Sequence, residues 1–384
     1  GVGIGFHEHN QVNYLNPASY SAIDSMTFIL DAGISGQVTN FNENGVKKNA
    51  NNSNLEYVVG GFRLLRHVGM SFGIIPFTNV GYDYSTSGYV NKEDKDVTYS
   101  NTYSGEGGLH QVYLGAGWSP VKGLAVGANI GYLWGSINKT VQNAYSNSYY
   151  KSLYRTYGTS VHNYKLDLGV QYTQKISKKD ELTLGLTYTP GHNLHADADM
   201  NIISSNAQTS TSDTLAFSIN NAYELPTMIG AGLMWNHNHQ WKVGFDYTLQ
   251  KWGSLGYPTY SANSSESWAL RDGIYMDRSK FNLGFQYCYA ENGRASFLKR
   301  VHYRAGVSYA TPYYKVNGVD GPKEISVSAG FGIPIMNGYN NRSQLNISGQ
   351  WVKSSAKDLI KENSFRINIG FTFNEDWFKK WKMQ

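Results

Sequence analysis

The stretch "FRINIGFTF", residues 365–373, decides the fold class of this chain. Apolar side chains occupy every second position from Phe365 to Phe373, and Arg, Asn, Gly and Thr fill the positions between them. Successive side chains of a β-strand point to opposite faces, so this segment predicts a strand with one apolar and one polar face. The apolar face would meet lipid and the polar face the inside of a barrel.

The same alternation recurs along the chain in fourteen segments. Most are at least as long as the roughly 9–11 residues with which a tilted strand crosses a bilayer, and no window approaches the roughly 20 apolar residues of a transmembrane helix. The approximate spans are 26–41, 52–65, 68–84, 109–119, 123–142, 160–176, 181–196, 213–235, 240–252, 279–290, 301–314, 323–335, 343–354 and 364–373.

The connections between these segments alternate in length. Short ones, such as 119–123, 177–181 and 236–240, follow even-numbered segments, and long polar ones, such as 86–108 and 253–278, follow odd-numbered segments. Short turns on one side and long loops on the other are typical of outer-membrane barrels. The sequence therefore predicts an all-β fold, a fourteen-stranded antiparallel transmembrane β-barrel in the bacterial outer membrane, with both termini on the periplasmic side.

Composition agrees with this class and excludes others. The chain has 41 Gly and 30 Tyr, and only 16% of its residues are charged, against roughly 25% in soluble domains. The net charge of +5 is spread without a basic block, so we expect no nucleic-acid partner. Because Gly1 is not a start methionine, we expect a processed or trimmed chain. The single cysteine, Cys288, excludes an internal disulfide, and between two tyrosines we expect a small buried residue in a strand.

Charged residues within the segments are expected to face the interior. A lysine or arginine facing lipid at mid-depth costs roughly 2–4 kcal/mol, whereas inside the barrel it can pair across the lumen or with a plug. These lumen residues are Lys165, Asp167, Lys242, Asp246, Arg304 and Arg366. Five tryptophans near segment ends are expected at the membrane interfaces: Trp118, Trp134, Trp235, Trp252 and Trp351.

The first 25 residues do not alternate. They hold small residues and an Asn16-Pro17-Ala18 turn, which indicate a compact irregular segment. A lumen fourteen strands around is too wide for side chains alone to fill, so this segment is expected to fold inside as a plug. We therefore divide the chain into a plug (1–25), a barrel (26–373) and a C-terminal tail (374–384).

The stretch "NPASYSAIDSMTF", 16–28, resembles the N-terminal plug of FadL-type outer-membrane transporters of fatty acids and other hydrophobic compounds. The likeness rests on Asn16, Pro17 and Ala18, with Asp24 following and fourteen strands behind them, in a form similar to Bacteroidota members. In that family the third strand is kinked and leaves a lateral gap. The resemblance implies that Pro76 and its neighbours Ile75, Phe77 and Thr78 line such a gap; a bulge without a transport role is the alternative.

The tail "NEDWFKKWKMQ" joins aromatic and basic residues. Trp377, Phe378 and Trp381 lie among lysines, a composition that suits an interfacial anchor or a docking peptide for a partner protein.

Histidine groups offer weaker alternatives. His237 and His239 in a turn, or His192, His195, Asp197 and Asp199 near a loop, could hold a metal, but solvated positions are favoured. His7, Glu8 and His9 could latch the plug to lumen charges, although simple packing is favoured.

No phosphate loop, nucleophile elbow or zinc signature is present, so we expect neither enzyme activity nor a cofactor or metal. Three functions stay open. The first is passive conduction of hydrophobic or amphipathic small molecules through a lateral or plug-side exit. The second is an accessory role in a multi-protein outer-membrane assembly or secretion complex. The third is a general porin. The expected partners are outer-membrane lipid, a hydrophobic ligand, or a periplasmic or outer-membrane protein.

Overall fold

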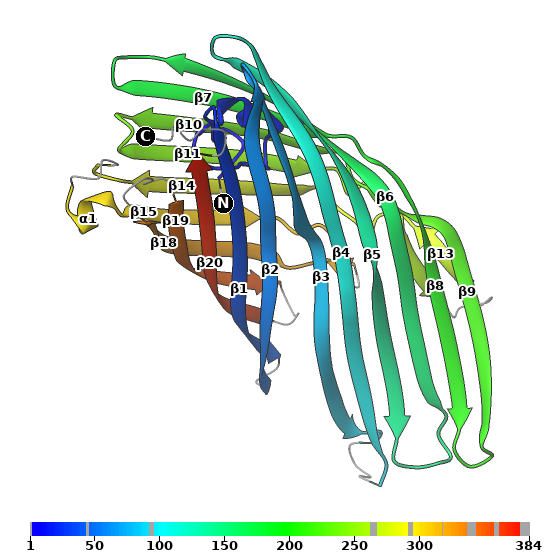
Figure 1. Ribbon diagram of the computed structural model, residues 1–384. Helices are drawn as coiled ribbons and strands as arrows, with labels where there is room; N and C mark the ends of the chain where they lie inside the picture. Colours follow the sequence, from blue (N-terminus) through cyan, green and yellow to red (C-terminus); the bar gives the residue numbers. More distant parts are fainter. Residues whose placement is uncertain are drawn as a thin grey trace, which may run out of the picture.

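Antiparallel strands close into a barrel in the computed structural model (Figure 1). The structure describes residues 2–43, 46–91, 96–261, 267–290, 295–316, 318–335, 343–356 and 361–376. The wall consists of β1 (Thr27–Glu43), β2 (Val46–Leu65), β3 (Val68–Tyr89), β4 (Thr98–Val121), β5 (Leu124–Tyr145), β6 (Ser152–Lys175), β7 (Asp180–Thr189), β8 (His192–Asn206), β9 (Thr211–Leu225), β10 (Met228–His237), β11 (Trp241–Gln250), β14 (Arg278–Tyr287), β15 (His302–Ala310), β18 (Lys323–Ile335), β19 (Ser343–Ser355) and β20 (Lys361–Asp376).

Closure confirms the predicted fold class. Successive strands of the wall pair with one another, except that β7 pairs with β6 and β10, and β8 pairs with β6 and β9. β20 pairs with β1 and β5 pairs with β6, so the ring has fourteen positions. Two of these positions contain two strands each. β7 continues into β8 after a break at Pro190 and Gly191, and β9 continues into β10 after a break at Pro226 and Thr227. Closing the sheet lets neighbouring strands satisfy the backbone groups that hydrocarbon would otherwise leave unpaired.

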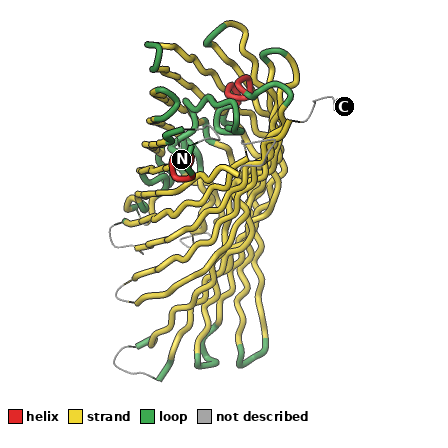
Figure 2. Tube along the Cα trace, turned by 60° about the vertical axis from the view of Figure 1, so that its left-hand side comes forward, coloured by secondary structure: helices red, strands yellow, loops and turns green. Residues whose placement is uncertain are grey.

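One side of the barrel is much taller than the other. β3, β4, β5, β6, β8 and β9 extend as a curved wall far beyond the ends of β18, β19 and β20 (Figures 1 and 2). β3 also leaves β2: their pairing ends at Val58 opposite Ile74, while β3 stays paired with β4 as far as Tyr89 opposite Thr98. We call this part of the wall the projecting sheet.

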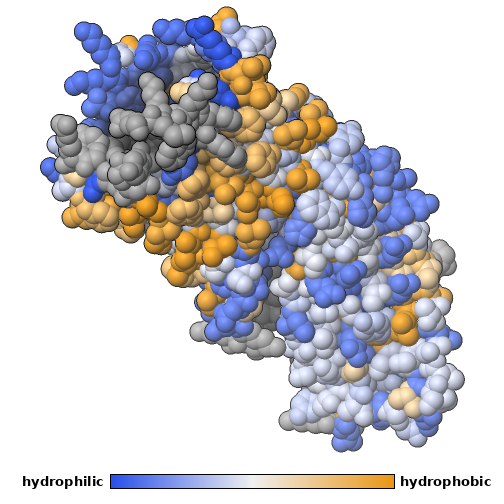
Figure 3. Space-filling model, viewed as in Figure 1, coloured by the Kyte–Doolittle hydropathy of each residue, from blue (hydrophilic) through white to orange (hydrophobic). Residues whose placement is uncertain are grey.

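A hydrophobic belt surrounds the shorter part of the wall. Figure 3 shows apolar surface gathered over the half that carries β1, β2 and β20, and more polar surface over the projecting sheet. The outward side chains of the opening stretch belong to the belt, because Phe365, Ile367 and Phe371 are all exposed. Lipid therefore meets the barrel around this belt, and the projecting sheet stands outside it.

Three of the five expected tryptophans mark the edges of the belt, and a fourth, Trp134, lies in the middle of β5 opposite His110. Trp118, Trp235 and Trp351 are 52%, 40% and 41% exposed and lie near strand ends, as an interfacial girdle requires. Trp252 does not join them. It lies in a loop and packs against Tyr275 and Tyr313, with ring centroids 5.3 and 5.5 Å away. The expectation for Trp252 was wrong, because the segment assigned to 240–252 ends as a strand at Gln250.

Helical structure is minor. A 3₁₀-helix, η1, covers Pro17–Ala22, and a four-residue helix, α1, covers Phe297–Arg300. Within the described part of the chain, neither helix is long or apolar enough to span a membrane. Two short hairpins, β12 (Tyr257–Ser261) with β13 (Ser267–Arg271) and β16 (Lys315–Val316) with β17 (Val319–Asp320), belong to the long connections. Cys288 is buried, one residue beyond the end of β14 rather than within it.

Candidate functional site

The N-terminal segment, residues 2–25, forms no strand and packs against the inner face of the wall. Asn16 begins η1: its Oδ1 accepts from the amide of Ala18 at 3.2 Å, and Pro17 follows where a missing N–H costs nothing. The Nδ2 of Asn16 donates to the carbonyl of Ile4 at 2.8 Å. Asn16 thus links two parts of the segment, which helps to explain why the segment is compact without a strand or a long helix.

A row of glycines receives this segment. Gly69, Gly117, Gly127 and Gly169 stand directly opposite one another on β3 to β6. A Cβ on Gly69 would lie 1.8 Å from the carbonyl oxygen of Tyr20, so even alanine would collide. Similar conflicts, between 2.0 and 2.7 Å, would arise with the segment at Gly117, Gly127, Gly169, Gly185, Gly232 and Gly244. We call these residues the glycine row; it lets the segment lie directly on the backbone of the wall.

Two predicted lumen residues hold the start of the segment. Asp246 is 1% exposed, and its Oδ2 accepts from the amides of Gly3 and Ile4 at 2.6 and 3.0 Å. Lys242, two residues earlier on β11, pairs with Glu8 at 2.7 Å, and both side chains are nearly buried. A buried charge without a partner is costly, so these contacts fix the position of the segment as well as its fold.

Polar side chains of other strands bond to the segment. Gln171 on β6 donates to the carbonyls of Ile4 and Phe6 at 2.9 and 3.1 Å and contacts His7 Nδ1 at 2.7 Å. Arg63 on β2 donates to the carbonyl of Ser21 at 3.2 Å. The segment is therefore bonded to several sides of the wall at once.

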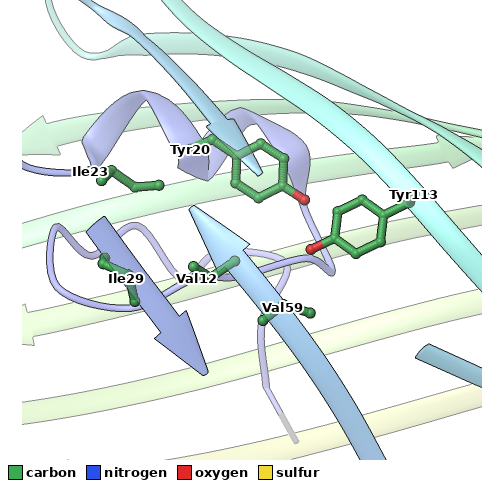
Figure 4. Close-up of a cluster of buried hydrophobic side chains, with 6 residues drawn as sticks. All are labelled: Val12, Tyr20, Ile23, Ile29, Val59 and Tyr113. Atoms are coloured by element: carbon green, nitrogen blue, oxygen red, sulfur yellow. The ribbon is translucent and has the colours of Figure 1, made fainter. Parts of the chain in front are cut away.

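An apolar cluster joins the segment to β1, β2 and β4. Figure 4 shows Tyr20 and Ile23 facing side chains of the wall, and Val12 beneath them. The phenol of Tyr20 is fully buried and donates to Asn129 Oδ1 at 3.0 Å. The cluster comprises Val12, Tyr20, Ile23, Ile29, Val59 and Tyr113. Burying each large side chain contributes roughly 1.5–3 kcal/mol, so apolar packing adds to the polar contacts.

Among the described residues, the remaining lumen charges bond to side chains of the wall; Arg304 reaches the segment only indirectly, because Gln344 also accepts from Gln11 at 3.4 Å. Lys165 pairs with Asp167 at 2.5 Å on the same strand. Arg304 donates to Gln286, Asn346 and Gln344 at 2.8, 2.6 and 3.2 Å. Arg366 donates to Gln37 at 2.6 Å and lies 3.6 Å from Glu56. The six residues thus form separate groups, with only Lys242 and Asp246 at the N-terminal segment.

A cavity of about 270 Å³ lies between Tyr14 of the segment and the wall, on the β1–β2 and β19–β20 side. Its lining includes Tyr14, Glu56, Tyr57, Asn346, Ser348 and Asn368. Burial, with the charges of Glu56 and Asp31 nearby, raises the pKa of Tyr14 to about 12, so this phenol stays neutral at any physiological pH. The cavity is small, and its lining mixes these polar side chains with Ile34 and Ile369, whereas drug-sized ligands occupy pockets of roughly 300–1,000 Å³ with mostly apolar walls.

Pro76 lies at a β-bulge in β3. It stands opposite His110, and Thr78 stands opposite Leu109, so Phe77 is the extra residue. Ile75 packs on the cluster of Figure 4, and Phe77 packs on a second cluster of Leu109, Leu133, Val161, Leu194, Ala196 and Leu225. Thr78 Oγ1 accepts from the amide of Leu109 at 3.1 Å. The bulge therefore sends two apolar side chains into the barrel, at the level where β3 leaves β2.

The histidine groups are dispersed. His9 contacts Asp24 at 2.8 Å within the segment, and His237 contacts Asp180 at 2.7 Å. His192 and His195 lie at the start of β8: His192 stacks on Tyr164 and His195 contacts Asn221. Among the described residues, no three His, Cys, Asp or Glu side chains are grouped as a metal site requires. Trp377, Phe378 and Trp381 lie outside the described residues.

The glycine row was missed at the level of the sequence. Inward positions were recognised as rich in Gly, but their alignment across strands depends on register, which alternation alone does not specify. The available signal was the recurrence of an inward glycine a few residues from a short turn, at Gly69, Gly117, Gly127, Gly169 and Gly185.

Fold and lumen together define a FadL-type outer-membrane β-barrel. Solved structures of that type cover nearly the whole chain. The Pseudomonas putida toluene transporter TodX has a TM-score of 0.64 at 14% identity, covering 98% of this chain and 96% of its own. The CymD monoaromatic hydrocarbon channel has a TM-score of 0.63 at 16% identity, covering 97% and 94%. A Pseudomonas aeruginosa FadL homologue has a TM-score of 0.63 at 11% identity, covering 98% and 96%.

Family membership is more specific than this fold. The family model described as BamG matches residues 1–384, and the chain belongs to the BamG family. No curated protein matches the chain. The predicted FadL-like fold is thus confirmed, and the family within which it occurs is BamG.

Proposed function

We propose that this protein is an accessory subunit of a multi-protein assembly in the bacterial outer membrane, with its own lumen closed by the N-terminal segment acting as a plug. The observation that carries the proposal is how firmly that segment is held. Its backbone lies on the glycine row, and its buried polar contacts engage Asp246, Lys242 and Gln171. A barrel filled in this way is suited to being a scaffold rather than a wide channel.

Two further features support a role beside other proteins. The family to which the whole chain belongs is BamG, a name that favours a place in a protein assembly. The projecting sheet, from β3 to β9, adds a large solvated wall that a simple conduit does not need. Solvated walls rich in Tyr, Ser and Asn are suited to adaptable protein contacts.

We place both termini and the short turns on the periplasmic side. The N-terminal segment precedes β1 at the end of the barrel where the turns between β2 and β3, β4 and β5, and β10 and β11 are short. The long connections and the projecting sheet would then face the cell exterior. In this orientation the tail with Trp377, Phe378 and Trp381 is on the side where it would act as an interfacial anchor or bind a periplasmic partner.

Purification from the native membrane in mild detergent tests the proposal. We expect partner proteins in fixed ratio to the barrel, identified by mass spectrometry, and their loss after harsher detergent. Truncation should remove residues 377–384 only, because β20 continues to Asp376 and Asn374 is buried. A lone barrel from the native membrane, at full yield, would contradict the accessory role.

Transport is the second candidate, and the bulge at Pro76 favours it. β3 departs from β2 near Ile74, and the neighbouring bulge directs Ile75 and Phe77 into the lumen. Structures of the same fold are named as toluene and monoaromatic hydrocarbon channels. Passive passage of a hydrophobic molecule through the β2–β3 side would use this site. Uptake of radiolabelled toluene into cells that carry the protein, compared with a Phe77→Asp variant, tests it: equal uptake by both and by cells without the barrel rules transport out.

A further inference from the structure

β9 is the last strand of the projecting sheet and has a free long edge. It pairs with β8 from Asn206 opposite Thr211 to His192 opposite Leu225, and the strand order ends there. In the described part of the chain, no strand pairs with the other edge of β9. The β12–β13 hairpin lies near the sheet without joining it: the rings of Tyr260 and Phe217 are 5.9 Å apart, and Trp268 donates to the carbonyl of Ala198 at 2.8 Å.

The part of this edge that is farther from the N-terminal segment, residues 211–219, lacks the features that protect exposed edges. Lysine, proline and β-bulges normally keep an edge strand from pairing with another chain. Residues 211–219 contain no Lys, Arg or Pro, and the register shifts of this pair are confined to its other end, between Asn193 and Ala198. Every residue from Thr211 to Ala216 is exposed. Nine residues of regular, accessible strand edge are therefore ready to accept another strand.

The side chains beside the edge specify what kind of strand would fit. Leu215, Phe217 and Ile219 alternate along the inner face of β9, opposite Ile202, Met200 and Ala198 of β8. Leu215 remains 42% exposed at the edge. A strand added there would extend this row if it carried apolar residues at alternate positions.

The charge of the β8–β9 pair indicates which kind of partner strand would bind. The β8–β9 pair, residues 192–225, holds Asp197, Asp199, Asp213 and Glu224 and no Lys or Arg, although the whole chain has a net charge of +5. The two aspartates of β8 already accept hydrogen bonds, Asp197 from the amide of Asn221 and Asp199 from Ser218. Their negative charge nonetheless stays on an exposed surface, where it attracts a basic strand and repels an acidic one.

We propose that the free edge of β9 binds an extended, basic segment of a partner protein by strand addition. This inference rests on the proposed accessory role and names the surface and chemistry of one contact. Main-chain hydrogen bonds along Thr211–Ile219 supply affinity, the row of Leu215, Phe217 and Ile219 fixes register, and the carboxylates select for Lys or Arg.

Photo-crosslinking in the native complex tests the surface directly. A photoreactive residue at Ser218 should capture a partner segment that contains Lys or Arg at alternate positions. The same residue at Ser160 on β6 should not, because β6 is paired on both sides and lies away from the edge. Two results overturn the inference. One is a crosslink from Ser218 only to a second copy of this chain; the other is no crosslink from Ser218 while Ser160 captures a partner.

Two sets of variants test the mechanism. Consecutive backbone amides of a strand point to opposite edges, and proline lacks the amide N–H. Of the two variants Leu215→Pro and Ala216→Pro, one therefore removes a hydrogen-bond donor from the free edge and the other removes a donor to β8. In the variant that keeps the barrel folded, the amount of partner retained should fall about tenfold or more. A tenfold fall corresponds to a loss of roughly 1.4 kcal/mol of binding free energy. Wild-type retention by both folded variants overturns strand addition.

The charge variant has a matched control. Asp197→Asn, Asp199→Asn, Asp213→Asn and Glu224→Gln together should weaken retention and its dependence on salt. The same neutralisation at four exposed carboxylates elsewhere, Asp83, Glu106, Asp272 and Asp320, should not. Equal effects of the two sets overturn the basic partner. Absence of any partner from the wild-type protein is a different result, which overturns the proposed function itself.

Discussion

Asp246 tests most directly, at the scale of one residue, how the N-terminal segment is held. Asp246→Ala leaves the amides of Gly3 and Ile4 buried without acceptors, at a cost of roughly 1–3 kcal/mol for each unsatisfied group. We expect faster hydrogen exchange and easier proteolysis of residues 2–15, with the barrel still folded. Asp167→Asn is the control, because Asp167 bonds to Lys165 and Thr189 of the wall and, among the described residues, to none of the segment. Unchanged exchange in Asp246→Ala would contradict the latch.

Lys251 and Asp277 predict a pH dependence outside the barrel wall. Their ion pair of 2.7 Å joins the two ends of the long loop between β11 and β14, and both side chains are exposed. Hydrogen bonds from Lys251 and the Gly253 amide lower the pKa of Asp277, so folding is favoured above the ordinary carboxyl pKa. This contribution is lost as the pH falls through the lowered value, below about pH 4.

Hydrogen exchange of residues 251–261 measures this effect. Protection should fall on acidification in the wild type and stay flat in Asp277→Asn. The change should be small and weaker at high salt, because exposed ion pairs contribute little. Identical acid profiles for the two proteins would show that the ion pair does not order the loop.

At the scale of secondary-structure elements, the glycine row predicts which substitutions in the wall disturb the packing of the N-terminal segment. Gly127→Val would place its Cβ 2.4 Å from the backbone of Pro17 and should displace η1, with a cost typical of overpacking, roughly 1–3 kcal/mol. Gly36→Val is the matched control, since no atom lies within 4 Å of its Cβ position. Unfolding in denaturant should show a lower midpoint for Gly127→Val alone. Equal midpoints would mean that the segment gives way without cost.

The strands show what alternation can and cannot predict. The opening stretch lies within β20 as expected, because one face meets lipid and the other the lumen. β4 begins at Thr98, whereas the sequence predicted a start at 109, because in the projecting sheet both faces meet water and apolar alternation disappears. The breaks at Pro190 and Pro226 were also missed: the alternation on each side reads as one strand.

The sequence predicted which side chains of the candidate site face the interior, but not which residues they contact. Alternation placed Asp246 and Lys242 inside the barrel, and "NPA" marked the turn that begins η1. Which strand faces which part of the N-terminal segment depends on contacts far apart in sequence, such as Gly3 with Asp246. Local patterns carry no such information, so it could not be anticipated that Arg304 and Arg366 bond directly to side chains of the wall rather than to the segment.

At the scale of the whole molecule, the occupied lumen separates an accessory barrel from a general porin. In planar bilayers the wild-type protein should conduct little, because the N-terminal segment and the apolar clusters obstruct the barrel. Deletion of residues 2–24 exposes the glycine row, Lys242 and Asp246 to water and should open an ion-conducting pore. Asp246→Ala should lie between the two, with brief openings as the segment loosens. High conductance of the wild type, unchanged by the deletion, would favour the porin and would mean that ions pass beside the segment rather than being stopped by it.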